Sequence, residues 1–169
     1  MHTIRRLTLG EGVLYRSLRL EALKDSPEAF ATRYESALQR DDESWALQAD
    51  SSAEGNDRAT FIVFDGRPIG LAAIYRDAGN PSIGELLQMW IAPSYRGTAV
   101  ATDLLDHLFC WATRHSFSSI RAEVTQGNVR ALRCYEKYGF RPLSPDTMNS
   151  LLTKPVEPDG GVTDKQGES

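Results

Sequence analysis

The stretch NVRALRCYEKYGF, residues 128–140, is the most informative segment of this chain. Leu132 and Tyr135 lie at helical spacing within it, and Asn128 suits the N-cap position of a helix. Gly139 follows the last helical residue, at the C′ position where a left-handed backbone favours glycine. The pattern therefore predicts a helix with defined ends. In this pattern alone, Tyr135 is equally well explained as a core aromatic residue whose hydroxyl is hydrogen-bonded.

A second informative unit, RGTAVAT at residues 96–102, lies upstream between a strand and a helix. The strand is predicted at 83–91, and the helix at 98–115, where Val100 and Leu104 begin an apolar stripe. A helix N-terminus exposes unpaired N–H groups and a partial positive charge, which together can hold a pyrophosphate. Small side chains let phosphates reach those amides. A tight turn has the same composition, so this unit alone does not decide the function.

The rest of the chain predicts further elements on both sides of these two units. Asp65-Gly66 is a strong hairpin signal between strands at 60–64 and 68–75, so with the strand at 83–91 three strands form an antiparallel meander. The remaining predicted elements are a strand at 3–7, helical regions at 11–23 and 28–48, and strands at 120–124, 140–143 and 148–153. Within 28–48, the acidic residues Asp41, Asp42 and Glu43 suit the first turn of a helix that runs past Trp45. Residues 154–169 contain few apolar side chains and are predicted to be a flexible tail.

Bulk composition narrows the functional classes. The chain has 169 residues, 41% hydrophobic and 25% charged, which suits one soluble domain. A net charge of −4 argues against a nucleic-acid surface, and no apolar run is long enough for a membrane helix. Cys110 and Cys134 lack metal-site spacing, so we expect no metal and a reducing, cytoplasmic location.

Together, and in this order, the two units resemble the GNAT superfamily of N-acetyltransferases. Its pyrophosphate motif is Arg/Gln-x-x-Gly-x-Gly/Ala, and Arg96, Ala99 and Ala101 occupy those positions. The resemblance covers residues 61–140 by motif and nearly the whole chain by element order. Its later motif is Asn-x-x-Ala-x-x-x-Tyr-x-Lys-x-Gly-Phe, and every named position is matched, by Asn128, Ala131, Tyr135, Lys137, Gly139 and Phe140.

The resemblance implies an α/β (α+β) fold. Its sheet would be mixed and mostly antiparallel, with flanking helices, and would splay where coenzyme A enters between the strands at 83–91 and 120–124. One N-acetyltransferase domain would occupy residues 1–153, followed by the tail at 154–169. The helices and loop at about 20–45 would wall the acceptor pocket. Many members of the superfamily are dimers, so a homodimer is one implied assembly.

The resemblance also implies site residues, with acetyl-CoA as co-substrate. Backbone groups of the strand would bind the pantetheine arm, and the amides at 96–102 would bind the pyrophosphate. Tyr135 would protonate the leaving thiolate. Glu85 stands where some members carry a general base, although water alone serves in many others. The implied coenzyme-binding residues are Met89, Trp90, Ile91, Arg96, Gly97, Thr98, Ala99, Val100, Ala101, Thr102 and Asn128.

The implied function is direct transfer of an acetyl group to a primary amine within a ternary complex. The acceptor would be a small-molecule amine or the N-terminus or lysine of a protein. Ala99 departs from the motif, which has glycine there, and its methyl group would crowd the pyrophosphate. A non-catalytic acyl-CoA sensor or an interaction module of the same fold is therefore the alternative. An acetylated Cys134 intermediate is a weaker hypothesis, because no base adjoins it in the sequence.

Overall fold

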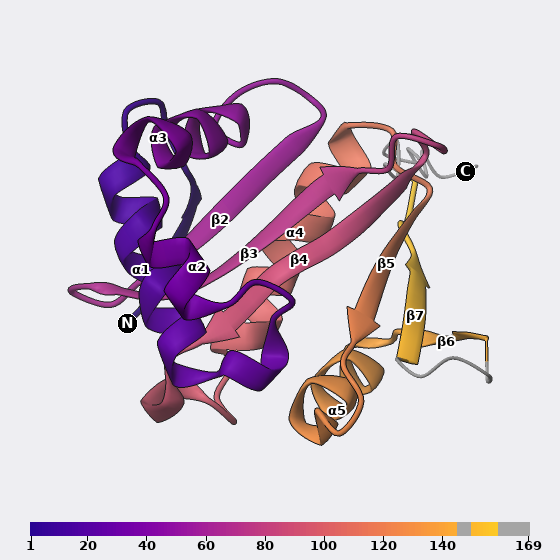
Figure 1. The fold of residues 1–169 in the computed structure, drawn as a ribbon. Coiled ribbons are helices and arrows are strands. Elements are labelled where there is room, and N and C mark those ends of the chain that lie inside the picture. Colours follow the sequence, from indigo (N-terminus) through magenta and orange to yellow (C-terminus); the bar gives the residue numbers. More distant parts are fainter. Residues whose placement is uncertain (145–149, 159–169) are drawn as a thin grey trace, which may run out of the picture.

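The structure is a computed structural model that describes residues 1–144 and 150–158. In this part of the chain, a single sheet has the strand order β1-β2-β3-β4-β5-β7-β6, with helices on both faces (Figure 1). This arrangement confirms the predicted fold class. The strands are β1 (Thr3–Arg6), β2 (Arg58–Phe64), β3 (Pro68–Arg76), β4 (Ile83–Ile91), β5 (Ser119–Val124), β6 (Arg141–Ser144) and β7 (Ser150–Pro155). The helices are α1 (Gly12–Asp25), α2 (Tyr34–Leu38), α3 (Asp42–Ser51), α4 (Val100–Arg114) and α5 (Val129–Tyr138), with short 3-10 helices η1 (Pro27–Ala29) and η2 (Pro93–Tyr95).

The sheet splits between β4 and β5. The two strands pair in parallel only where residues 83–86 face residues 119–122. Beyond this point they diverge, and α5 lies near the open end of β5 (Figure 1). A bulge accompanies the split, because Leu71 pairs with Trp90 whereas Ala73 pairs with Leu87. Gln88 lies within the bulge and takes a left-handed backbone, with φ of 59°. The predicted splay between these strands is confirmed.

The helices cover the two faces of the sheet unequally. α4 packs across β1 to β4 on one face, and α1 and α3 pack on the other (Figure 1). The apolar stripe predicted for α4 is buried, as shown by Leu104 and Leu108, which have no exposed surface. On the opposite face, Tyr15 and Trp45 pack edge to face with ring centroids 5.7 Å apart. β4 therefore has a packed helix on each face beside the split.

Two predicted segments are corrected by the structure. The helical region predicted at 28–48 is divided, because Asp41 takes an extended backbone and its carboxylate accepts the Ser44 amide hydrogen bond at 2.8 Å, which starts α3 separately. The predicted tail begins too early, because β7 continues through Pro155 and Val156 is buried. Residues 145–149 and 159–169 lie outside the described part, which includes Met148 and most of the predicted tail.

Candidate active site

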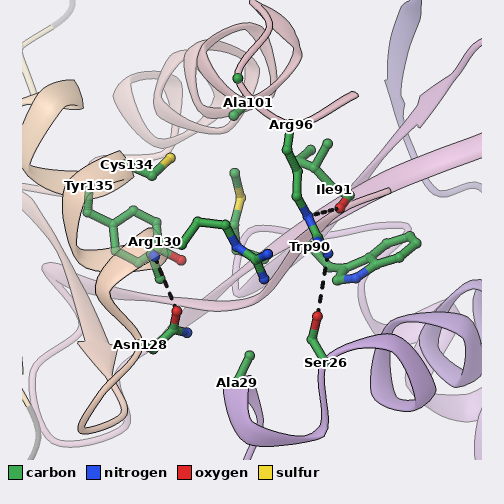
Figure 2. Close-up of a pocket in the computed structure, with 13 residues that line it drawn as sticks. Ser26, Ala29, Trp90, Ile91, Arg96, Ala101, Asn128, Arg130, Cys134 and Tyr135 are labelled. Carbon is green, nitrogen blue, oxygen red and sulfur yellow. Dashed lines mark hydrogen bonds between the residues drawn. The ribbon is translucent and has the colours of Figure 1, made fainter. Parts of the chain in front are cut away.

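Two cavities lie at the split in the sheet. The first, here called the α4 cavity, has a volume of about 160 Å³ and lies beside the N-terminus of α4. Figure 2 shows Tyr135 and Cys134 on one side of it, with Trp90, Ile91 and Arg96 on the other. It therefore lies between β4 and α5, beyond the point where β4 and β5 stop pairing.

The second cavity, here called the α1 cavity, has a volume of about 370 Å³, within the usual size range of small-molecule sites. Arg19 of α1 lines it, together with Phe30 of the following loop and Glu123 of β5. The two cavities share five lining residues and therefore adjoin. These shared residues are Ala29, Met89, Asn128, Ala131 and Tyr135.

Tyr135 stands at this junction, and its local structure explains its fixed position. The Asn128 side chain accepts a hydrogen bond from the Ala131 amide at 3.2 Å and caps α5 (Figure 2). At the other end, Gly139 takes φ of 117°, and its amide donates to the Tyr135 carbonyl at 3.1 Å. The Tyr135 ring also packs on Phe140, with centroids 5.4 Å apart. Both ends of α5 are therefore capped, and these caps fix the position of Tyr135 between the two cavities.

The environment of the Tyr135 hydroxyl favours its protonated form. The side chain is 7% exposed. Burial raises the pKa of this phenol above its ordinary value, and the neighbouring Cys134 raises it further. The hydroxyl therefore carries its proton throughout the neutral pH range and can act as a proton donor.

The N-terminus of α4 opens toward the first cavity. Gly97 takes φ of 76°, and a Cβ built on it would meet no atom within 4 Å, so the space beside it is open. The Thr98 hydroxyl donates to the Tyr95 carbonyl at 2.5 Å, which holds the turn that leads into the helix. First-turn amides of a helix have no partner within the helix, so this end can bind an anion.

Asp25 fixes the wall opposite α5. Its Oδ2 accepts hydrogen bonds from the Ser26 hydroxyl at 2.7 Å, the Trp90 indole at 3.0 Å and Arg96 Nη2 at 2.6 Å. Arg96 also donates through Nε to the Ile91 carbonyl at 3.0 Å. Desolvation raises the pKa of Asp25, but these hydrogen bonds and the charge of Arg96 outweigh it and lower the pKa to about 2. The C-terminus of α1 is thereby tied to β4 and to the loop before α4.

The residues predicted to bind the coenzyme divide into two groups. Those that line the α4 cavity are Met89, Trp90, Ile91, Arg96, Gly97, Ala101 and Asn128. The remainder do not line it. Val100 points into the core, with 3% exposure, whereas Thr98, Ala99 and Thr102 are exposed. Backbone amides of this second group remain part of the α4 N-terminus, so a backbone role does not require their side chains in the cavity.

Glu85 lies apart from both cavities. It forms an ion pair with Arg121 of β5, the residue directly opposite it in the parallel pairing. Arg121 also contacts Asp77 at 3.2 Å. Glu85 is therefore held at the paired end of β4, before the strands separate.

Three charged residues at the cavities were not singled out from the sequence. Arg130 lines the α4 cavity, and Arg19 and Glu123 line the α1 cavity. One signal was available for Arg19, because it lies four residues after Tyr15 and four before Leu23, on the buried face of α1. Glu123 and Arg130 lack a comparable signal, since both occupy ordinary exposed positions on their elements.

The structure disfavours Cys134 as a nucleophile. Burial raises the pKa of the Cys134 thiol, which reduces the thiolate fraction that a nucleophile needs. Among the described residues, no group of His, Cys, Asp and Glu side chains is arranged to hold a metal ion. In the same part of the chain, no helix is long and apolar enough to cross a membrane.

Comparison with known proteins agrees with this geometry. The sequence profile described as the Acetyltransferase (GNAT) family matches residues 19–140. The chain therefore belongs to the GNAT family of acetyltransferases. It is 34% identical over 77 residues to uncharacterized N-acetyltransferases of Mycobacterium bovis and Mycobacterium tuberculosis. That match covers 46% of this chain and 48% of each relative, so the chain spans about half the length of the curated relatives it matches.

Solved structures with the same fold include two acetyltransferases. A GNAT-family acetyltransferase of Streptococcus pneumoniae superimposes with a TM-score of 0.79 at 17% identity, covering 93% of this chain and 100% of that one. The PaiA N-acetyltransferase of Thermoplasma acidophilum, solved in complex with coenzyme A, gives a TM-score of 0.77 at 19% identity. That match covers 92% of this chain and 99% of the other. At these identities the likeness establishes the fold.

Proposed function

We propose that this protein transfers the acetyl group of acetyl-CoA to a primary amine by direct attack within a ternary complex. The observation that carries the proposal is the junction of the two cavities at Tyr135. The α4 cavity adjoins a helix N-terminus that suits an anion. The α1 cavity does not adjoin this helix N-terminus, and it is large enough for a small acceptor. Two reactants entering from opposite sides would meet beside a buried proton donor. Family membership and the coenzyme A complex of the Thermoplasma relative support the same conclusion.

The α4 cavity would hold the coenzyme. Backbone groups of Met89, Trp90 and Ile91 would bind the pantetheine arm, because this part of β4 is not paired with β5. The amides of residues 96–102 would bind the pyrophosphate, and the open space beside Gly97 lets phosphates approach them. Asn128 lines both cavities, and it would bind the pantetheine arm or its phosphate end. Arg130, on the same wall, adds a positive charge that suits a phosphate.

Tyr135 would act as the general acid. Acetyl-CoA supplies the acetyl group as a thioester, and forming the amide bond breaks the carbon–sulfur bond and releases a thiolate. Tyr135 retains its proton because burial raises its pKa. It can therefore give that proton to the departing sulfur, a contribution typical of general acids. The proton that the attacking nitrogen loses as the amide forms then restores the phenol.

The acceptor must lose a proton before it attacks, because alkyl ammonium groups are largely protonated at neutral pH. Glu123 lines the α1 cavity together with Tyr135, whereas Glu85 lies outside it and pairs with Arg121. We therefore propose that the ammonium proton passes to Glu123 or to water. Glu85 would then affect the reaction only indirectly, through the position of β5.

The proposed function is tested with purified protein, acetyl-CoA and a panel of primary amines that includes polyamines, amino sugars, amino acids and peptide N-termini. Amine-dependent release of free thiol, with the acetylated amine identified by mass spectrometry, is the expected result. Thermal stabilisation by acetyl-CoA without thiol release would instead indicate a sensor. Absence of stabilisation at millimolar acetyl-CoA would exclude coenzyme binding altogether.

A further inference from the structure

Arg19 is a buried cation with an unused hydrogen-bonding group. The residue is 6% exposed, and its Nη1 atom is buried without a hydrogen-bond partner. Among the described residues, no carboxylate forms an ion pair with it. A buried, unpaired charge is costly, so a position of this kind requires compensation.

The protein itself supplies only partial compensation. The Arg19 guanidinium lies over the Phe30 ring, 5.1 Å from its centroid, and this cation–π contact fixes its orientation. Its other electrostatic neighbours are the phenols of Tyr15 and Tyr75 and the like-charged Arg40. Desolvation lowers the pKa of Arg19, which reflects the unfavourable environment of the charge. None of these contacts supplies the negative charge that a buried guanidinium favours.

Arg19 lines the α1 cavity, which adjoins the α4 cavity at Tyr135. Of the described residues that line the α1 cavity, only Arg19 and Glu123 carry a charge. Arg19 comes from α1 and Glu123 from β5, which lie on either side of β4 (Figure 1). One cation and one anion on separate walls match a ligand that itself carries one charge of each sign.

We propose that Arg19 binds a carboxylate of the acceptor, so that the acceptor is a small amine of the amino-acid type. This inference rests on the proposed function and narrows its substrate. The substrate carboxylate accepts hydrogen bonds from the guanidinium, and the substrate amine lies toward Glu123 and Tyr135. A peptide N-terminus lacks the adjacent carboxylate and does not fit. A phosphate dianion fits poorly, because one cation balances half of its charge and Glu123 repels the rest.

The test compares standard L-amino acids with their amides, their decarboxylated amines and O-phosphoethanolamine as acceptors for the full chain. For the amino acid that serves as acceptor, kcat/KM is expected to exceed the value for its amide and for its decarboxylated amine by at least about tenfold. This factor corresponds to the free energy of one charge-assisted hydrogen bond. Equal rates for an amino acid and its amide, or a preference for O-phosphoethanolamine, would overturn the proposal.

Variants of Arg19 separate recognition from folding. Arg19→Met keeps the apolar stem and is expected to reduce the preference for the amino acid over its amide to within about twofold, chiefly through KM. Arg19→Lys keeps the charge and is expected to retain part of the preference. Arg16→Met is the matched control, because Arg16 lies one turn earlier on α1 and lines neither cavity. Equal loss of activity on amino acids and amides in both Arg19 variants would show a structural role and overturn the proposal.

The carboxylate subsite can be tested even if the protein shows no acetyltransferase activity. If no acceptor releases thiol, calorimetric titration of the coenzyme A-saturated protein with an L-amino acid and its amide still tests the subsite. Tighter binding of the amino acid, lost in Arg19→Met but kept in Arg16→Met, supports it. Equal binding of the two ligands, or no binding of either, overturns it.

Discussion

The Asp25 carboxylate lies 2.6 Å from Nη2 of Arg96, and this contact joins the end of α1 to the loop that precedes α4. The same oxygen accepts the Trp90 indole hydrogen bond, so one carboxylate positions two residues that line the α4 cavity. Neither side chain of the ion pair is fully exposed, at 29% for Asp25 and 23% for Arg96. Asp25 is therefore a positioning residue for the wall of the α4 cavity.

Asp25→Asn is expected to weaken both stability and coenzyme binding. The amide keeps the shape of the side chain but removes its charge, so the free energy of unfolding should fall by about 1–2 kcal/mol, as for a partly exposed charged hydrogen bond. Urea denaturation measures this change, and calorimetry with acetyl-CoA measures the affinity. Asp57→Asn is the matched control, because Asp57 pairs with Arg76 at 3.3 Å but its side chain is 86% exposed. A loss in the control equal to that in Asp25→Asn would contradict the assigned role.

Acid should destabilise the protein through two carboxylates. The pKa of Asp25 is about 2, and the pKa of Glu11 is also lowered to about 2, chiefly by the hydrogen bond from Arg5. Both pKa values lie below the ordinary values of about 4 that apply to the unfolded chain. The stability that these groups contribute is therefore complete above about pH 5 and is lost as the pH falls from about 4 toward 2. Thermal unfolding followed between pH 7 and pH 2 measures it, and the double variant Glu11→Gln/Asp25→Asn should show a flatter curve.

Tyr135→Phe is expected to lower kcat at least about tenfold while leaving the fold intact, because only the proton donor is removed. Thiol release under saturating acetyl-CoA measures the change. Tyr138→Phe is the matched control from the same helix, since the Tyr138 hydroxyl donates to Asp106 at 2.7 Å and lines neither cavity. Full activity of Tyr135→Phe would remove this residue from the mechanism.

Glu123→Gln and Glu85→Gln should affect the pH dependence of the reaction differently. If Glu123 receives the ammonium proton, Glu123→Gln lowers kcat/KM at neutral pH by about tenfold or more and makes the rate rise with pH, since deprotonation then depends on solvent. Glu85→Gln should leave the shape of the pH profile unchanged. A profile altered by Glu85→Gln and not by Glu123→Gln would reverse the assignment.

The sequence predicted the part of the fold that depends on local signals. The bounds of β4 agree with the prediction at 83–91, and Gly139 ends α5 with the left-handed backbone that its position favours. The acidic run Asp41-Asp42-Glu43 was predicted to form the first turn of a helix, and α3 starts there. The residues before it were assigned to the same helical region, although they form η1, a loop and the short α2. Local signals are sufficient where a cap or a turn has a strong sequence signature, and they are insufficient for the weakly patterned residues that precede such a signal.

Only the site residues that occupy motif positions were predicted from the sequence. Asn128 and Tyr135 were expected in one site because the resemblance implies it, and both line the two cavities. Arg19 and Glu123 are far apart in the sequence, and the chain shows their shared cavity only after the sheet has formed. Glu85 was a candidate general base beside water, and the parallel pairing places Arg121 next to it, outside the lining of both cavities. Contacts between separate elements of this kind have no counterpart in a local pattern.

The substitution at Ala99 is expected to be neutral for coenzyme binding. Its backbone lies in the right-handed region, with φ of −69° and ψ of −6°, which alanine adopts without strain. Its side chain is exposed and does not line the α4 cavity. The residue that requires glycine is Gly97, with φ of 76°.

Two single substitutions test this distinction. Ala99→Gly should change the dissociation constant of acetyl-CoA by less than about twofold, since no backbone strain is relieved. Gly97→Ala should weaken acetyl-CoA binding and lower the free energy of unfolding by about 1 kcal/mol or more, because a left-handed backbone is unfavourable for alanine. Calorimetry and urea denaturation measure the two effects. A gain in affinity of tenfold or more in Ala99→Gly, by contrast, would show that the alanine methyl group crowds the pyrophosphate, as the motif alone suggests.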